Sequence, residues 1–236
     1  MFRRLKSRTF AARQARVVCL QLTDKDMRTA ALFDLDGVLV DTESSYTEFW
    51  TLVGKTYFPE NVQFAQSIKG QTLTNIYADH FADRPDWQEA VMCELDSFEQ
   101  SMGYPYVPGA MDFVRQLRER GVGVAVVTSS NCKKMENLYR EHPEFPAAFD
   151  RIFTAEDALR SKPAPDCYIA AAQHFGLSAA SCVVFEDSFN GLRSGRASGA
   201  KVVGLATSHP ASVIRDYADE VVADFQDAEK LLHWFD

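Results

Sequence analysis

The sequence predicts an α/β protein with a doubly wound parallel sheet and a small all-helical cap inserted after the first strand. Two observations favour this fold class. Short apolar runs alternate with amphipathic stretches from residue 109 to the end of the chain, as in proteins built from strand–helix–strand units. The stretch from about residue 44 to residue 105 contains no strand-like run and has the spacing of helices.

The first predicted strand covers residues 30–33 and leads directly into two acids. Asp34 and Asp36 are separated by Leu35 and followed by Gly37. In an extended chain the side chains of Asp34 and Asp36 point to the same side. Ligands of open α/β sheets bind at the carboxyl ends of strands. Two neighbouring carboxylates there need a cation or a shared proton, although a strand end with solvated acids and a turn glycine would give the same pattern.

The predicted cap begins with a helix from residue 42 to about 54, and prolines and a glycine divide the rest of the cap. Further helical stretches are expected at 62–68, 73–81 and 87–102. The return to the core is marked by Pro105, Pro108 and Gly109. The predicted organisation is a core of residues 27–43 and 106–236 with a helical cap of residues 44–105.

The remaining elements alternate along the core. Strands are predicted at 122–127, 152–153, 182–185, 201–205 and 220–222, and helices at 110–120, 131–140, from the loop at Lys162 to about 175, and at 189–198. Continuous apolar strands are buried on both faces, which is typical of a parallel sheet covered by helices on each side. The expected architecture is therefore Rossmann-like.

The composition of the chain restricts the classes of function that it can have. The chain has 236 residues, of which 46% are hydrophobic, so it can form a sizeable core. Its formal net charge of −8 argues against a nucleic-acid-binding surface. Five cysteines without a CxxC pair predict reduced thiols and a cytoplasmic location. No apolar run is long enough to span a membrane, and we expect a monomer without a membrane partner.

Residues 1–26 differ from the rest of the chain because they are basic and contain no acid before Asp24. They have the composition of a transit-type leader, or of a translated upstream region if Met27 is the natural start. We expect this extension to be dispensable. Its deletion should leave turnover and the melting temperature unchanged, and a large fall in melting temperature would contradict this.

Polar side chains come directly after three of the predicted strands. Asp34 and Asp36 follow the first, Thr128 follows the second, and Glu186 and Asp187 follow the strand at 182–185. Each has an ordinary alternative explanation, such as a helix cap or a solvated turn. The carboxyl ends of parallel strands lie at one edge of a sheet, so we expect these groups, with a lysine from the loop at residue 162, to meet.

The expected cleft suits a phosphoryl group. Four carboxylates favour a hard divalent cation with oxygen ligands, most naturally Mg²⁺. Lys162 adds a positive charge. Thr128 supplies a hydroxyl, and the amides after it begin a helix, which favours a bound phosphate.

Four segments in this order, DLDGVLVDTE, VVTSS, SKPAPD and FEDSFNG, resemble the four motifs of the haloacid dehalogenase-like (HAD) superfamily. The resemblance extends from about residue 28 to the end. It is greatest to the branch with a helical cap, which includes β-phosphoglucomutase and many sugar-phosphate phosphatases. By position, it implies that Asp34 is a nucleophile that forms an aspartyl-phosphate. Asp36 would be the general acid and base, with its backbone carbonyl also facing the metal.

The same resemblance assigns the other site residues. Asp34, Asp36 and Asp187 would ligate Mg²⁺, with Glu186 supporting the metal's ligand shell. The transferring phosphoryl group would be held by Thr128 and the amide of Ser129. Lys162 would orient the nucleophile and neutralise phosphate charge.

The resemblance implies that a cap loop containing Lys69, Gly70 and Gln71 selects the substrate. An ordinary loop between two helices would have the same composition. In β-phosphoglucomutase an arginine follows the loop glycine, and a histidine on the first cap helix contacts the acid/base aspartate. Here Gln71 follows Gly70, and Tyr46 stands at about the histidine position. Both departures favour hydrolysis over mutase chemistry.

We therefore predict a Mg²⁺-dependent phosphatase for a small phosphorylated metabolite, such as a sugar phosphate. The nearest alternative is a sugar-phosphate mutase that uses the same aspartyl-phosphate. A haloacid dehalogenase is disfavoured, because Asp36 and Asp187 suit a metal-assisted phosphoryl site. A phosphonate hydrolase would need a cap lysine such as Lys69 as a Schiff base. A non-catalytic phosphate-binding protein is the alternative from another class, but it would more naturally have lost Asp34 or Asp36.

Overall fold

The computed structural model describes residues 28–68 and 71–236. The predicted extension 1–26 and the loop residues Lys69 and Gly70 lie outside this part of the chain. The centre of the fold is a sheet of six strands in the order β3-β2-β1-β4-β5-β6, with every neighbouring pair parallel. Its strands are β1 (Ala30–Phe33), β2 (Gly123–Val127), β3 (Arg151–Phe153), β4 (Cys182–Glu186), β5 (Lys201–Leu205) and β6 (Glu220–Val222). This confirms the predicted doubly wound α/β fold.

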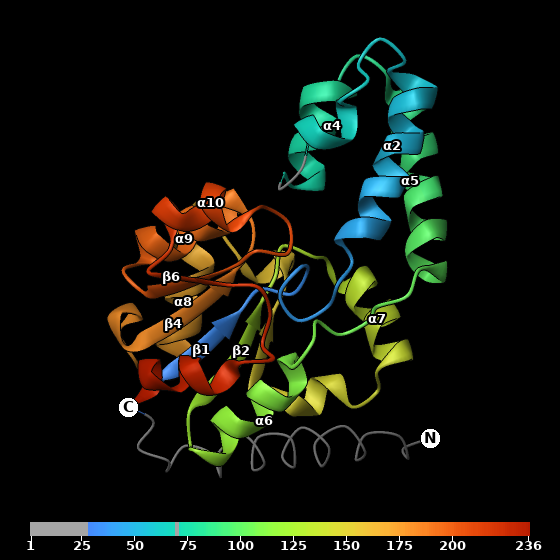
Figure 1. The fold of residues 1–236 in the computed structure, drawn as a ribbon. Helices are drawn as coiled ribbons and strands as arrows, with labels where there is room; N and C mark the ends of the chain where they lie inside the picture. The colour runs from blue at the N-terminus through green and yellow to red at the C-terminus, as the bar shows by residue number, and fades with distance from the viewer. Residues whose placement is uncertain (1–27, 69–70) are drawn as a thin grey trace, which may run out of the picture.

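Helices cover both faces of the sheet (Figure 1). They are α6 (Ala110–Glu119), α7 (Cys132–Glu141), α8 (Asp166–His174), α9 (Phe189–Ser198) and α10 (Ala211–Ile214), with 3₁₀ helices η1 (Phe145–Ala148), η2 (Ala155–Asp157), η3 (Ala179–Ser181), η4 (Arg215–Tyr217) and η5 (Ala228–Phe235). Alternate residues of each strand face opposite layers. Phe33 packs in the cluster that includes α6 and α7, whereas Leu32 packs in the cluster that includes α8 and α9.

The helical insertion extends from the sheet as a separate group in Figure 1. It contains α2 (Glu43–Tyr57), α3 (Phe64–Ser67), α4 (Leu73–His80) and α5 (Pro85–Ser101). These helices enclose an apolar cluster of their own, centred on Trp50, Phe64 and Phe81. The boundaries given above for the core (residues 27–43 and 106–236) and for the cap (residues 44–105) remain a prediction.

Two helix boundaries differ from the expected ones for local reasons. The first cap helix continues to Tyr57, past Gly54; a Cβ atom at Gly54 would lie 3.0 Å from Phe64 Cβ, so the glycine allows Phe64 to pack closely against this helix. The helix after β2 begins at Cys132 because the Asn131 side chain accepts a hydrogen bond from the backbone N–H of Lys134 and caps the helix.

The position of β1 determines where a ligand site can form. β1 lies in the middle of the sheet, with β2 on one side and β4 on the other. The order of strands reverses direction here, and open α/β sheets bind ligands at such a crevice, outside the carboxyl ends of the strands. None of the helices in the described ranges is both long enough and apolar enough to span a lipid bilayer.

Candidate active site

A cavity of about 330 Å³ lies between the carboxyl end of β1 and the helical insertion. The sequence-predicted residues that line its sheet side are Asp34, Asp36, Thr128, Ser129, Lys162 and Glu186. The insertion contributes a wall of mixed character. Its aromatic and apolar residues include Tyr46, Trp50, Ile68, Leu73 and Ile76, and its polar and acidic residues include Glu43, Thr47, Gln71, Thr72 and Glu99. The cavity can therefore hold a polar reacting group at one end and a larger remainder at the other.

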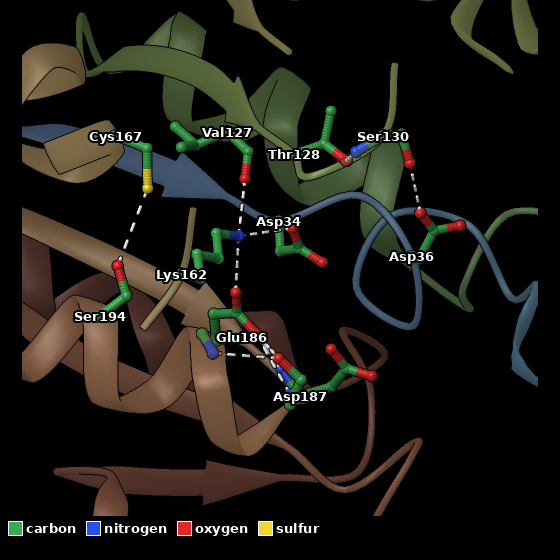
Figure 2. A network of polar contacts seen from close by, with 12 residues as sticks. Asp34, Asp36, Val127, Thr128, Ser130, Lys162, Cys167, Glu186, Asp187 and Ser194 are labelled. Carbon is green, nitrogen blue, oxygen red and sulfur yellow. Dashed lines mark hydrogen bonds and ion pairs between the residues drawn. The ribbon is translucent and has the colours of Figure 1, made fainter. Parts of the chain in front are cut away.

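Three carboxylates meet at the sheet side of the site (Figure 2). Asp34 directly follows β1, Glu186 is the last residue of β4, and Asp187 follows it. Their exposed fractions are 8%, 0% and 2%, and one oxygen atom from each lies within 4.8 Å of the others. The parallel register of β1 and β4 brings these acids together, as the sequence predicts.

Lys162 is the cation of this cluster. Its Nζ atom donates to Asp34 Oδ1 and to Glu186 Oε1, at 2.7 Å in each case, and to the carbonyl oxygen of Val127 at 2.9 Å. These contacts engage all three N–H bonds of the ammonium group. The side chain is 6% exposed, so the loop before α8 delivers a charge that is fixed in direction and held away from water.

Glu186 is itself held firmly in place. Its Oε1 accepts from Lys162 and from the hydroxyl of Tyr168 at 2.9 Å, and its Oε2 accepts from the next two backbone N–H groups and the Ser188 hydroxyl. A Cβ atom at Gly191 would lie 1.7 to 2.1 Å from the carboxylate atoms, so the first turn of α9 needs glycine there. Five donors therefore orient this acid beside the other two.

The electrostatics of the cluster favour an additional positive charge. Burial raises the pKa of Asp34 to about 7 against the attraction of Lys162, and Glu186 and Asp36 raise it further. Burial, and then Glu186 and Asp34, hold the pKa of Asp187 well above its usual value. Burial opposes the charge on Lys162, but Asp34 and Glu186 hold its pKa well above the usual range. One ammonium does not neutralise three buried carboxylates.

The residues present fit a hard divalent cation. Mg²⁺ and Ca²⁺ prefer oxygen ligands, and all the side chains of the cluster other than Lys162 offer carboxylate oxygens. The Asp187 carboxylate also accepts a hydrogen bond from the Ser208 hydroxyl, which orients it. A Cβ atom at Gly37, where φ is +72°, would lie 2.1 Å from Asp187 Oδ2, so the turn after β1 needs a glycine to let this acid approach.

Asp36 has a different environment from Asp34. Its Oδ1 accepts from the Thr42 hydroxyl and, at 2.6 Å, from Lys134 Nζ, while its Oδ2 accepts from the Ser130 hydroxyl at 2.9 Å. Burial alone would raise the pKa of Asp36, but Lys134 and these hydrogen bonds hold it below its usual value. Thr42 stands at the N-cap of α2 but directs its hydroxyl to Asp36 instead of capping the helix.

The segment after β2 forms the neighbouring wall of the cavity. Thr128 is buried, its N–H donates to Phe153 O at 2.9 Å, and its hydroxyl accepts from the backbone N–H of Ser130, also at 2.9 Å. Ser129 is exposed to the cavity. The structure thus brings the predicted phosphate-binding residues to the same cavity as Asp34.

Several residues of the site were not predicted from the sequence. Lys134 contacts Asp36, Tyr168 contacts Glu186, and Glu99 lines the cavity from α5. Tyr46, which stands at about the position of the mutase histidine, donates to Glu99 Oε1 at 2.8 Å. Of the predicted cap loop, Gln71 lines the cavity; its other two residues are outside the described ranges.

Comparison with known proteins identifies the family. Residues 29–199 match the family model described as haloacid dehalogenase-like hydrolase. The "Probable pseudouridine-5'-phosphatase" of Drosophila melanogaster is 29% identical over 209 residues, which cover 81% of this chain and 90% of that protein. The "Hexitol phosphatase A" of Escherichia coli is 30% identical over 178 residues, which cover 74% and 81%.

A solved structure shows the same fold. The HAD hydrolase of family IA, variant 3, from Entamoeba histolytica superposes with a TM-score of 0.74 at 19% identity, covering 88% of this chain and 99% of that one. At this identity the likeness concerns the fold alone. Since the family model spans most of the chain, from β1 through α9, the chain belongs to the haloacid dehalogenase-like hydrolase family.

Proposed function

We propose that this hydrolase is a Mg²⁺-dependent phosphatase that releases phosphate from a small monoester, such as a sugar phosphate, through an aspartyl-phosphate on Asp34. The observation that carries the proposal is the buried cluster of Asp34, Lys162, Glu186 and Asp187 at one end of a cavity that is otherwise large enough for a metabolite. The relatives named as phosphatases in Drosophila melanogaster and Escherichia coli support it.

The reaction would proceed in two displacements. In the first, a carboxylate oxygen of Asp34 forms a bond to phosphorus while the bond to the leaving oxygen breaks, and Asp36 gives that oxygen a proton. Because the pKa of Asp36 lies below its usual value in the free protein, Asp36 would take up this proton when the negative charge of the phosphate ester enters the site. In the second, Asp36 takes a proton from a water molecule, and the water oxygen attacks phosphorus and releases Asp34. General acid–base assistance of this kind contributes on the order of 10²- to 10⁴-fold.

The other residues would hold the phosphoryl group and the nucleophile. Lys162 fixes Asp34 through their 2.7 Å contact and offsets phosphate charge. Thr128 and the amide of Ser129 would bind the phosphoryl oxygens at the wall formed after β2. Asp34, the backbone carbonyl of Asp36 and Asp187 would hold Mg²⁺, with Glu186 in support. When bound, the ion would stabilise the negative charge of the transferring group.

The alternatives predict different products. A sugar-phosphate mutase would convert a sugar phosphate into its isomer, whereas a phosphatase releases inorganic phosphate. Gln71 lines the cavity where the mutase motif has arginine, which favours hydrolysis. A non-catalytic protein would bind phosphate esters and leave them intact. A screen of sugar phosphates, nucleotides and pyrophosphate for released phosphate and for isomerised product separates the three.

We also propose that the protein acts as a monomer in the cytosol.

Metal removal is expected to abolish phosphate release and to lower stability. Chelation should reduce turnover to background, and Mg²⁺ should restore it. Because the ion offsets repulsion among buried acids, saturating Mg²⁺ should raise the melting temperature by roughly 3–8 °C. Thermal unfolding with and without Mg²⁺ measures this. The control is Asp187→Asn, which should lose most of the Mg²⁺-dependent rise; an equal rise in both proteins would contradict the assigned ligands.

A further inference from the structure

Lys134 occupies an unusual place for a lysine on the first turn of a surface helix. It belongs to α7, in which the preceding residue, Lys133, is half exposed and paired with Asp96 of α5. The Lys134 side chain is 7% exposed, and its Nζ atom lies 2.6 Å from Asp36 Oδ1. A buried lysine of this kind needs an explanation, because removing an ammonium group from water is costly.

The other side of Lys134 faces the helical insertion. Its Nζ atom lies 4.5 Å from the centroid of the Tyr46 ring, a cation–π distance, and the Tyr46 hydroxyl donates to Glu99 Oε1. Glu99 is 6% exposed, and burial raises the pKa of its carboxyl against the opposing effects of Lys134 and the Tyr46 hydrogen bond. Lys134 therefore lies between Asp36 on one side and a tyrosine–glutamate pair from α2 and α5 on the other.

Stability alone is a poor explanation for this arrangement. Replacing a buried ion pair by apolar side chains of similar volume is often neutral or stabilising, so the pair is more informative about geometry than about folding energy. Asp36 receives donors from three separate segments: Thr42 at the start of α2, Ser130 after β2 and Lys134 on α7. These contacts restrict both the position and the rotation of its carboxylate.

We propose that Lys134 is a positioning residue for proton transfer by Asp36, an inference that rests on the proposed phosphatase function. Its ammonium holds the Asp36 carboxylate, and the Tyr46 ring, whose hydroxyl donates to Glu99, lies over the ammonium. Proton transfer requires hydrogen-bond distance to the leaving oxygen, and an error of about 1 Å in position can reduce a rate by on the order of 10²-fold. Without Lys134 the carboxylate would be retained but would sample other positions.

The test compares two substrates that differ in their need for a proton. Phenolate is a poor leaving group and gains from protonation, whereas 4-nitrophenolate leaves readily without it. In Lys134→Met, kcat/KM should fall roughly 10- to 100-fold for phenyl phosphate but less than about 3-fold for 4-nitrophenyl phosphate. The ratio of the two values does not depend on how much of the sample is folded. Lys134→Arg, which keeps a charged donor, should recover most of the phenyl phosphate rate.

The matched control is Lys133→Met, which should leave the ratio unchanged because Lys133 contacts Asp96 and not Asp36. An equal fall for both substrates in Lys134→Met, as expected for a phosphate-binding or purely structural role, would overturn the proposal. If that variant does not fold, Thr42→Val removes another donor to Asp36 and should shift the ratio in the same direction; an unchanged ratio would also overturn it. Failure of the unaltered protein to release phosphate from either ester would refute the phosphatase function instead.

Discussion

Asp34→Asn is expected to lower the release of 4-nitrophenol from 4-nitrophenyl phosphate by at least about 10³-fold in the presence of Mg²⁺. The carboxamide has nearly the same shape but is a much weaker nucleophile than the carboxylate, so the first displacement would not occur. Loss of a nucleophile removes most of an enzyme's rate enhancement even when the rest of the site is intact. The side-chain carbonyl oxygen of the introduced asparagine could still accept a hydrogen bond from Lys162, which should preserve the local geometry.

The same substitution should make the metal-free protein more stable at neutral pH. Because the pKa of Asp34 is raised from 3.8 to about 7, the folded protein binds more protons than the unfolded chain across that range. Its free energy of unfolding therefore falls as the pH rises from about 4 to 7, by on the order of 3 kcal/mol from this group alone. Asp34→Asn removes this dependence. Urea unfolding at pH 5 and pH 7.5 without Mg²⁺ measures the difference.

These two results distinguish a catalytic loss from a folding defect. An inactive variant with unchanged or greater stability points to the chemistry of Asp34. Retention of near-normal turnover would exclude Asp34 as the nucleophile, and an inactive, strongly destabilised variant would leave a structural role as the explanation of the loss. The matched substitution Asp41→Asn, at an acid in the same segment that does not line the cavity, should leave turnover unchanged.

The strands and most of the site could be predicted from the sequence because both depend on local patterns. The apolar run of β1 ends at Asp34, and the run of β4 ends at Glu186, so the order of residues alone indicates which acids lie at the sheet edge. Parallel pairing then determines that they meet, because neighbouring parallel strands end at the same edge. Lys162 is expected at this cleft as part of the loop before a helix, but a loop lysine has no local pattern that indicates burial, so its contacts with Asp34 and Glu186 could not be predicted.

The network around Asp36 could not be predicted for the opposite reason. Lys134 and Glu99 are charged residues on amphipathic helices, and such residues are usually assigned to solvent. They are buried here because α5 and α7 pack beside each other where the helical insertion joins the sheet domain (Figure 1). That contact depends on how two helices far apart in the sequence cross. The only local indication was the adjacent pair Lys133–Lys134, because neighbouring residues of a helix point in different directions. In the structure Lys133 is exposed and Lys134 is buried.

Lys162→Met is expected to cause the largest loss of stability of any substitution in the site. Lys162 is buried and contacts two buried carboxylates, and removing one partner of a buried ion pair costs about 3–5 kcal/mol because the other charge is left without compensation. The pKa of Lys162 lies well above its usual range in the folded protein, so its contribution is fully present at neutral pH and is lost only under strongly alkaline conditions.

The pH dependence of this loss identifies its cause. Without the ammonium, the pKa of Asp34 should rise further, and the unfolding free energy of the variant should fall more steeply between pH 5 and pH 8 than that of the unaltered protein. Protonation at pH 5 relieves the repulsion, so the defect should be smaller there. Lys133→Met, which removes an exposed ion pair, should change stability by less than about 1 kcal/mol at either pH. Urea unfolding of both variants measures these effects. A defect of Lys162→Met that is equal at pH 5 and pH 8 would mean that lost packing, rather than uncompensated charge, destabilises the protein.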